Sequence, residues 1–416
     1  MVMTICPSEP HASVRPAQAR TPRRLTGSLI TWLRASLVCL VLPAVACTSG
    51  RGTLRSVGIT PDELLAGASL GVAKDAPVSL VGEQEVLALD PEILAFLDAH
   101  VDRKGSDNLK LRQLISAIID ADTFGVEYDD RTRTASETFR ARRGNCLSFS
   151  SMFVAMARNV GLRARFQEVD FPPDWTLDRD TYVLNQHVNV RVDLRGAAPR
   201  AVDFNIGDLK ASYEMWEIPD TRALAHYYNN IGVERMQAGD TASALSCFRR
   251  AIADGDRQFS PAWTNLGTLY LRNGHPAHAE AAYLQALKAS DSDLVAMSNL
   301  VRLYERLGDR EMAAEYQKRV IYHRNLNPYY RYELARRAYD AQQYDEAIGH
   351  LKFATRKRPN DDEFYFLMGL SYLGKGDAQA ARRWLARAEE VAATDALKRR
   401  YSSKIDTLLR DARTRH

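Results

Sequence analysis

The most regular pattern of apolar and small residues lies in the second half of the chain, where it recurs every 34 or 35 residues. The anchor pairs of this pattern are Ile231-Gly232, Leu266-Gly267, Leu300-Val301, Leu334-Ala335 and Met368-Gly369. A small residue follows in the same frame at Ala244, Ala279, Ala313, Ala347 and Ala381. This period predicts stacked pairs of antiparallel helices, with small residues where the two helices of a unit approach closely. Five units cover 224–395, and residues 396–416 predict a capping helix and tail.

The middle of the chain, residues 86–221, mixes helical and strand periodicities. Apolar residues at helical spacing predict helices over 92–100 and 108–121. The preceding residues, 47–85, are rich in Gly, Ser, Thr and Val and predict a loosely ordered tether.

A cysteine stands at the start of one predicted helix of this middle region. A capping box at Thr134 and Glu137 opens a short helix, and Gly144-Asn145-Cys146 follows it. The apolar positions after Cys146 have helical spacing up to Gly161. Free backbone N–H groups and the helix dipole favour a thiolate at such a helix start, so Cys146 is a candidate nucleophile.

A histidine and an aspartate on two predicted strands complete the candidate chemistry. His187 opens an alternating strand, and Asp203 lies on the next strand, sixteen residues on. A turn centred near Arg195 would make them direct cross-strand neighbours on one face, unless Pro199 inserts a bulge. Cys146, His187 and Asp203 then supply a nucleophile, a base and a group that orients the imidazole. Taken singly, each has a structural alternative: a buried helix cysteine, a sheet histidine and a turn aspartate.

These residues, with their context, resemble the transglutaminase-like family. The family pattern is matched by Gly144-Asn-Cys146 and by Arg158-Asn-Val-Gly161-Leu-Arg-Ala164-Arg165. The resemblance implies a papain-like α+β domain that cleaves or exchanges amide bonds through a thioester on Cys146. It departs from the family at Val188-Asn189, where a small residue and Trp are usual. The Cys146 N–H is a plausible oxyanion donor, with Asn145, Asn185 and Gln186 as supporting candidates.

The repeats of the second half resemble the tetratricopeptide repeat, an all-α superhelix with a concave groove. Asn230, Asn265 and Asn299 recur at one predicted groove position, where amides could bind the backbone of an extended peptide. The alternative is that Asn is merely common at that position. Cys247, in the second helix of the first unit, is interpreted as a small buried filler. The resemblance implies a protein partner in the groove.

Residues 1–46 predict an export signal. Five arginines precede an apolar run over 35–46. The run ends in Ala44-Val45-Ala46, and Cys47 follows it. This ending resembles a bacterial lipobox, although Ala44 replaces the usual Leu, and it implies lipidation of Cys47 and membrane anchoring. Thr48 after the cysteine favours the outer membrane, facing the periplasm. The alternatives are a plain signal peptide and an uncleaved anchor.

Charge and cysteine content exclude several partners and cofactors. Beyond residue 46 the chain carries 51 basic and 51 acidic residues, so no basic excess indicates nucleic-acid binding. Cys146 and Cys247 alone remain after Cys47, which excludes a disulfide framework. Acidic groups at 120–122, 127–130 and 178–180 could hold Ca²⁺, but solvated loop charge is the better interpretation, and no cofactor or metal is predicted.

The sequence therefore predicts an envelope-anchored cysteine enzyme that hydrolyses or transfers an amide bond of a protein or peptide. Its repeat array would recruit substrate or a partner. The alternative is a non-enzymatic scaffold or adaptor lipoprotein whose middle domain is vestigial. The nature of the acceptor, water or an amine, stays open.

Overall fold

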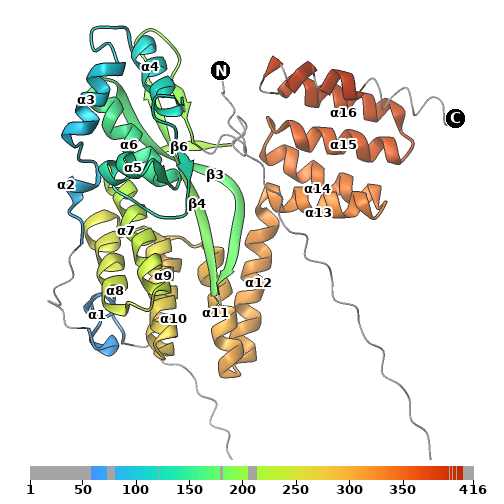
Figure 1. Cartoon of the computed structure of the whole chain (residues 1–416). Coiled ribbons are helices and arrows are strands. Elements are labelled where there is room, and N and C mark those ends of the chain that lie inside the picture. Colours follow the sequence, from blue (N-terminus) through green and yellow to red (C-terminus); the bar gives the residue numbers. More distant parts are fainter. Residues whose placement is uncertain are drawn as a thin grey trace, which may run out of the picture.

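The chain folds as a small mixed α/β region followed by an all-helical repeat array (Figure 1). The computed structural model describes residues 58–72, 80–120, 122–178, 181–204, 213–392, 394–395, 397–399 and 401–405, with no side chains described for 170–186. The α+β fold class followed by a helical superhelix is confirmed. Cys47 and the predicted leader lie outside the described residues.

The helices of the first region are α1 (Pro61–Ala66), the 3-10 helix η1 (Ala68–Leu70), α2 (Glu83–Val86), α3 (Pro91–His100), α4 (Asp107–Ile119), α5 (Ala135–Ala141) and α6 (Cys146–Asn159). Helices α3 to α6 follow the predicted periodicity, whereas the shorter helices before them lie within or at the end of the predicted tether. The predicted capping box opens α5: the Glu137 N–H donates to Thr134, and the Glu137 carboxylate accepts from the Thr134 N–H. Helix α6 is the core of the region, because its residues from Leu147 to Ala157 are all buried.

A four-stranded antiparallel sheet packs on α6, in the order β5-β4-β3-β6. Its strands are β3 (Arg163–Asp178), β4 (Thr181–Asp193), β5 (Arg200–Val202) and β6 (Met215–Ile218); β1 (Glu127–Tyr128) and β2 (Arg143–Gly144) form a separate parallel pair. The predicted alternation in β4 is confirmed, since Val188, Val190 and Val192 are buried. The ring of Phe204, beyond β5, packs on the rings of Phe149 and Phe153, as expected for a core residue.

The repeat array consists of successive antiparallel helix pairs. The pairs are α7 (Asp220–Gln237) with α8 (Thr241–Arg250), α9 (Ser260–Arg272) with α10 (Pro276–Ala289), α11 (Leu294–Leu307) with α12 (Arg310–Leu326), α13 (Pro328–Asp340) with α14 (Tyr344–Lys357), and α15 (Asp362–Gly374) with α16 (Ala378–Val391). A π-helical turn, η2 (Ala251–Gly255), extends α8.

Glycines at the anchor positions explain the close approach within a pair. A Cβ atom built on Gly267 would lie 2.7 Å from the Tyr283 ring, and one on Gly369 would lie 2.6 Å from Leu385 Cγ. Real Cβ atoms do not approach so closely, so these pairs need glycine to bring the helices together. Of the predicted capping helix, residues 397–399 and 401–405 are helical, and the remainder lies outside the described residues.

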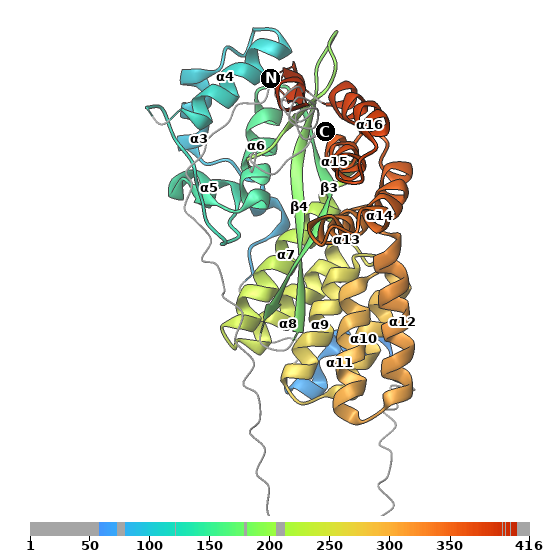
Figure 2. The same cartoon turned by 90° about the vertical axis from the view of Figure 1, so that its right-hand side faces the viewer.

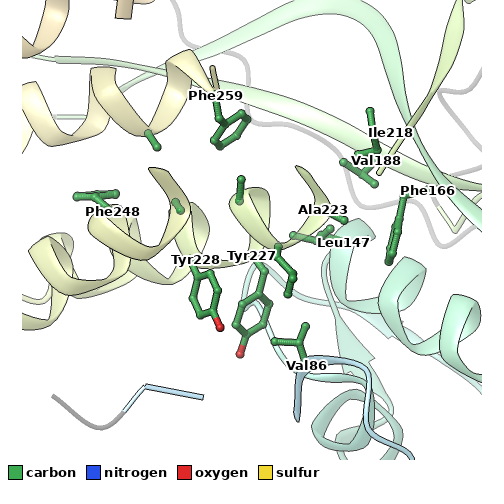
Figure 3. Packing of buried hydrophobic residues seen from close by; sticks show 14 of the residues in the cluster. Val86, Leu147, Phe166, Val188, Ile218, Ala223, Tyr227, Tyr228, Phe248 and Phe259 are labelled. Carbon is green, nitrogen blue, oxygen red and sulfur yellow. The ribbon is translucent and has the colours of Figure 1, made fainter. Parts of the chain in front are cut away.

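The two regions share one hydrophobic core at the junction of α6, the sheet and α7 (Figure 3). Leu147 of α6, Phe166 and Val188 of the sheet, and Ala223 of α7 belong to the same cluster. Strand β6 ends at Ile218 and α7 begins at Asp220, so almost no linker separates the two regions.

The predicted tether is partly structured, which corrects the sequence interpretation. Residues 58–72 contain α1 and η1 and pack against the repeats, with Leu64 only 1% exposed. Tyr270 donates a hydrogen bond to the Leu64 carbonyl at 2.7 Å, and Arg249 Nε donates to the Leu65 carbonyl at 2.7 Å. Ile59, Leu65, Leu70 and Val72 pack against the same core, but they do not form a long periodic pattern that the sequence alone would reveal.

Strands β3 and β4 continue beyond the sheet as a long two-stranded hairpin. It runs along the repeat array in both views (Figure 2). Its strands contact the first helices of four successive pairs: β3 contacts α7 and α13, and β4 contacts α9 and α11. No helix in the described part of the chain is long and apolar enough to cross a membrane.

Candidate active site

Cys146 is the first residue of α6, as the sequence predicts, and is half-buried. Asn145 is the N-cap, and its Oδ1 accepts hydrogen bonds from the Ser148 N–H and the Ser148 hydroxyl, both at 2.9 Å. Its Nδ2 donates to Thr132 Oγ1 at 2.8 Å. The Asn145 side chain therefore holds the start of α6 in place, and its supporting oxyanion role stays a prediction.

Gly144 allows the turn before the cysteine. A Cβ atom at this position would lie 2.7 Å from Ser148 Cβ and 3.3 Å from Ser148 Oγ. The glycine is needed because the chain passes directly over the first turn of α6, so its role is close packing around the cap.

His187 and Asp203 meet on the sheet. Their atoms Nε2 and Oδ2 lie 2.6 Å apart, and the two side chains are 12% and 3% exposed. Burial alone would lower the pKa of His187, but the hydrogen bonds and charges of Asp203 and Cys146 outweigh it and raise the pKa to about 10. Cys146 therefore lies close enough to the imidazole to affect its ionisation. The three predicted residues come together in space.

The strand register differs from the one predicted. A direct His187–Asp203 pairing would set Val190 opposite Arg200, but the ladder pairs Val190 with Val202. Continuing that register places Asp203 opposite Asn189, diagonal to His187. The two side chains still share a face because the shift is two residues, and sheet faces alternate with a period of two.

The remaining predicted site residues are two candidate oxyanion residues on β4 and three candidate groove asparagines on the repeats. Asn185 and Gln186 lie on β4, and their side chains are not described. Asn230 is partly buried on α7, whereas Asn265 and Asn299 are 7% and 1% exposed. The Asn265 amide donates to Asn229 Oδ1 at 2.9 Å, a bond between neighbouring repeats.

A buried ionic network between the sheet and the first repeat was missed by sequence reasoning. The Glu168 carboxylate on β3 lies 2.7 Å from His226 Nε2 and accepts from Arg222 Nε at 2.8 Å, both on α7. Burial opposes ionisation of Glu168, but these cations and hydrogen bonds lower its pKa to about 2. The alternation of β3 gives one sign of this network. Glu168 lies two residues after the buried Phe166 on the same strand, so both side chains are on the same face.

Tyr128 is a second residue that the sequence did not single out. It pairs with Gly144 through the β1–β2 bridge, and it is 62% exposed. Burial of the hydroxyl and then the nearby charge of Cys146 raise the pKa of Tyr128 to about 12. An exposed aromatic ring therefore stands beside the sulfur.

Members of the predicted acidic groups at 120–122 and 127–130 have protein partners, and the side chains of 178–180 lie outside the described residues. Asp129 pairs with Arg133, Glu127 pairs with Arg143, and Asp120 accepts from the Asp122 N–H. No group of three or more His, Cys, Asp or Glu side chains that could hold a metal ion occurs among the described residues. A cavity of about 590 Å³ lies between α5 and α7, and the three site residues do not line it.

Comparisons with known proteins agree with this organisation. Residues 98–197 match the model of the transglutaminase-like superfamily, and 229–293, 264–328 and 332–396 match a tetratricopeptide-repeat model. The chain therefore contains a transglutaminase-like domain followed by tetratricopeptide repeats.

Solved structures similar to part of the chain include MamA and YrrB. One crystal structure of MamA is 20% identical, covers 40% of this chain and 91% of its own, and has a TM-score of 0.22. YrrB, described as a TPR protein with an unusual peptide-binding site, is 18% identical over 43% of this chain and 92% of its own, also with a TM-score of 0.22. The comparison with curated proteins found no match.

Proposed function

We propose that this chain is a cysteine enzyme that hydrolyses or transfers an amide bond of a protein or peptide through a thioester. The observation that carries the proposal is the arrangement of His187, which binds Asp203 at 2.6 Å and lies close enough to Cys146 for the cysteine to help raise its pKa. A transglutaminase-like domain supports the same chemistry.

The first half of the reaction forms the thioester. The Cys146 thiolate attacks the amide carbonyl while the proton resides on His187, whose raised pKa favours the imidazolium. The imidazolium then gives that proton to the departing amine as the carbon–nitrogen bond breaks. Asp203 holds the ring in position and stabilises its positive charge.

The second half releases the acyl group. Water or an amine attacks the thioester, His187 takes the proton of the incoming nucleophile, and the sulfur leaves as the thiolate. The backbone N–H of Cys146, at the free amino end of α6, is our candidate donor to the developing oxyanion. The exposed ring of Tyr128 is a candidate wall for the substrate beside the sulfur.

Selective alkylation tests the reactive centre. Iodoacetamide at pH 6.5 should label Cys146 rapidly, and His187→Ala should slow the reaction by at least about tenfold, with modified sites identified by peptide mass spectrometry. Cys247→Ala is the matched control and should leave the labelling unchanged. An unlabelled Cys146 in the native protein would favour the alternative, a scaffold with a vestigial domain.

Substrate class can be tested in the same preparation. Envelope extracts and purified sacculi are incubated with the native protein and with Cys146→Ala, and released peptides and incorporated amines are measured by mass spectrometry. Cleaved stem peptides would assign peptidoglycan as substrate, and modified proteins would assign a protein substrate. The absence of any difference between the two proteins would contradict the enzyme.

We further propose that Cys47 is lipidated and anchors the protein in the bacterial envelope, at the outer membrane facing the periplasm. The lipobox-like sequence supports this assignment. Expression with an alkyne fatty acid should label the native protein and not Cys47→Ser. Equal labelling, or soluble native protein in the periplasm, would contradict it.

A further inference from the structure

The β3–β4 hairpin lies where an extended ligand of the repeat array would lie. Of the two strands that form it, β4 contacts α9 and α11, and β3 contacts α7 and α13; these are the first helices of four consecutive pairs. The hairpin runs along this side of the array (Figure 2). First helices line the concave face in this kind of superhelix, the face from which the sequence predicted peptide binding. The segment found there is part of the same chain.

Burial of α9 shows how completely this face is covered. Nine consecutive residues, Ala262–Tyr270, are buried, and nine residues make more than two full helical turns. The neighbouring helices α7, α8 and α10 cover part of this circumference, and β4 contacts the helix as well. By contrast, Tyr329, Ala335 and Ala338 are the buried residues of α13, further along the array.

The sequences of the hairpin and of the two helices that β4 contacts carry opposite net charges. Helices α9 and α11 carry three arginines, Arg272, Arg302 and Arg306, against one acid, Glu305. The hairpin sequence 170–186 carries four aspartates and one arginine. A net negative segment on a net positive helical surface is the pattern expected of a recognition site.

The hairpin is also joined to the candidate active site. Strand β4 runs from the hairpin to His187, which pairs with Val169. The ladder is irregular between Val169 and Asp174, where four residues of β3 face a single residue of β4. Such an irregularity bends a strand, so the hairpin leaves the sheet next to His187.

We propose that the first three repeats form a binding site for an acidic, extended polypeptide segment, and that the β3–β4 hairpin occupies this site in the same chain. A partner with such a segment binds by replacing the hairpin. The groove site does not depend on catalysis. Its consequence for His187 rests on the proposed function: displacement of the hairpin removes support from β4 and slows the reaction of Cys146.

Binding of a peptide tests the site directly. The probe is a fluorescent peptide with the sequence of residues 170–186, and its control has the four aspartates replaced by asparagine. The proteins are the full chain and a variant in which residues 176–183 are replaced by Asn-Gly, a turn that suits the facing residues Trp175 and Leu184. A hairpin in the same chain competes at an effective concentration of about millimolar, so the full chain should bind at least about tenfold more weakly than the shortened variant.

The shortened variant must retain the helical circular dichroism and melting transition of the native chain. Given that, absence of peptide binding to it, or equal binding to both proteins, would overturn the proposal. Equal binding of the asparagine peptide would overturn the acidic specificity.

Charge reversal gives a second test that leaves the hairpin intact. The variant Arg302→Glu/Arg306→Glu should accelerate hydrogen exchange of residues 170–186 by at least about tenfold. Its control is Arg356→Glu/Lys357→Glu, an exposed pair on the second helix α14. Unchanged exchange in the first variant would overturn the proposal.

Alkylation separates this proposal from the proposed function. Saturating peptide should slow iodoacetamide labelling of Cys146 in the full chain. Labelling that stays fast with peptide bound would overturn the link to His187, whereas a native Cys146 that never reacts would contradict the enzyme and leave peptide binding in place.

Discussion

The two cysteines in the described residues, Cys146 and Cys247, share a side chain and a helical backbone but stand in opposite environments. Cys247 lies inside α8, is 0% exposed, and has a pKa raised to about 12, chiefly by burial. Cys146 begins α6, is half-buried, and lies near the imidazole of His187, which Asp203 holds. The comparison teaches that helix position and neighbours decide the reactivity of a cysteine, because they determine how well a thiolate is stabilised.

Replacement of each cysteine by alanine should show the largest difference between the two positions. Cys146→Ala removes the nucleophile, and we expect amide turnover to fall by at least about 10⁴-fold. Cys247→Ala should retain turnover and lose only about 1 kcal/mol of stability from the small cavity. Turnover is measured on the substrate that the extract and sacculus assays identify, and stability by urea unfolding. Retained turnover in Cys146→Ala would place the chemistry elsewhere.

Loss of the imidazole should have the next largest effect. His187→Ala removes the base, and we expect turnover to fall by about 10²–10⁴-fold. Circular dichroism serves as the folding control, since His187 lies at the edge of the core. A variant that folds and turns over normally would exclude His187 from the reaction.

Replacement of Asp203 should lower the pH at which His187 loses its proton. The folded-state pKa of His187, about 10, is above its ordinary value of 6.5. The interactions of protonated His187 therefore contribute fully to the unfolding free energy below about pH 6.5. This contribution disappears as the pH rises through about 10. In Asp203→Asn the pKa of His187 should fall, so both the melting temperature and Cys146 alkylation should change at lower pH than in the native chain. Superimposable pH profiles of the two proteins would contradict this role.

The cap of α6 should have the smallest effect. Asn145→Ala removes the side chain that holds the Ser148 N–H, and we expect a loss of about 0.5–2 kcal/mol in unfolding free energy. Asn145→Asp keeps a capping oxygen and is the matched control. If Asn145 instead supports the oxyanion, alanine would lower turnover by far more than this loss of stability explains.

Local patterns predicted much of the candidate site, and long-range pairing was harder to predict. The capping box at Thr134 and the helix start at Cys146 follow from contacts between residues three or four apart. The predicted strand register was wrong by two residues, because the alternation of apolar residues does not determine the geometry of the turn. The site survives this error because an even shift keeps His187 and Asp203 on one face.

Contacts between the regions could not be predicted at all. The hairpin on the repeats and the Glu168 network both join residues more than fifty positions apart, and neither has a local signature. The residues 58–72 were misread for the same reason, since their partners, Arg249 and Tyr270, lie nearly two hundred residues further on.

The Glu168 network has a practical consequence for dissecting the protein. A gene cut at residue 219, between β6 and α7, would leave a carboxylate in an apolar interface without His226 and Arg222. The Trp216 indole N–H, at 3.0 Å, would be the remaining partner of this carboxylate. A buried carboxylate without its cations is costly, so the isolated first half should bind a proton more readily or expose its interface and aggregate. The boundary between two sequence families is thus not a boundary at which this polypeptide can be divided.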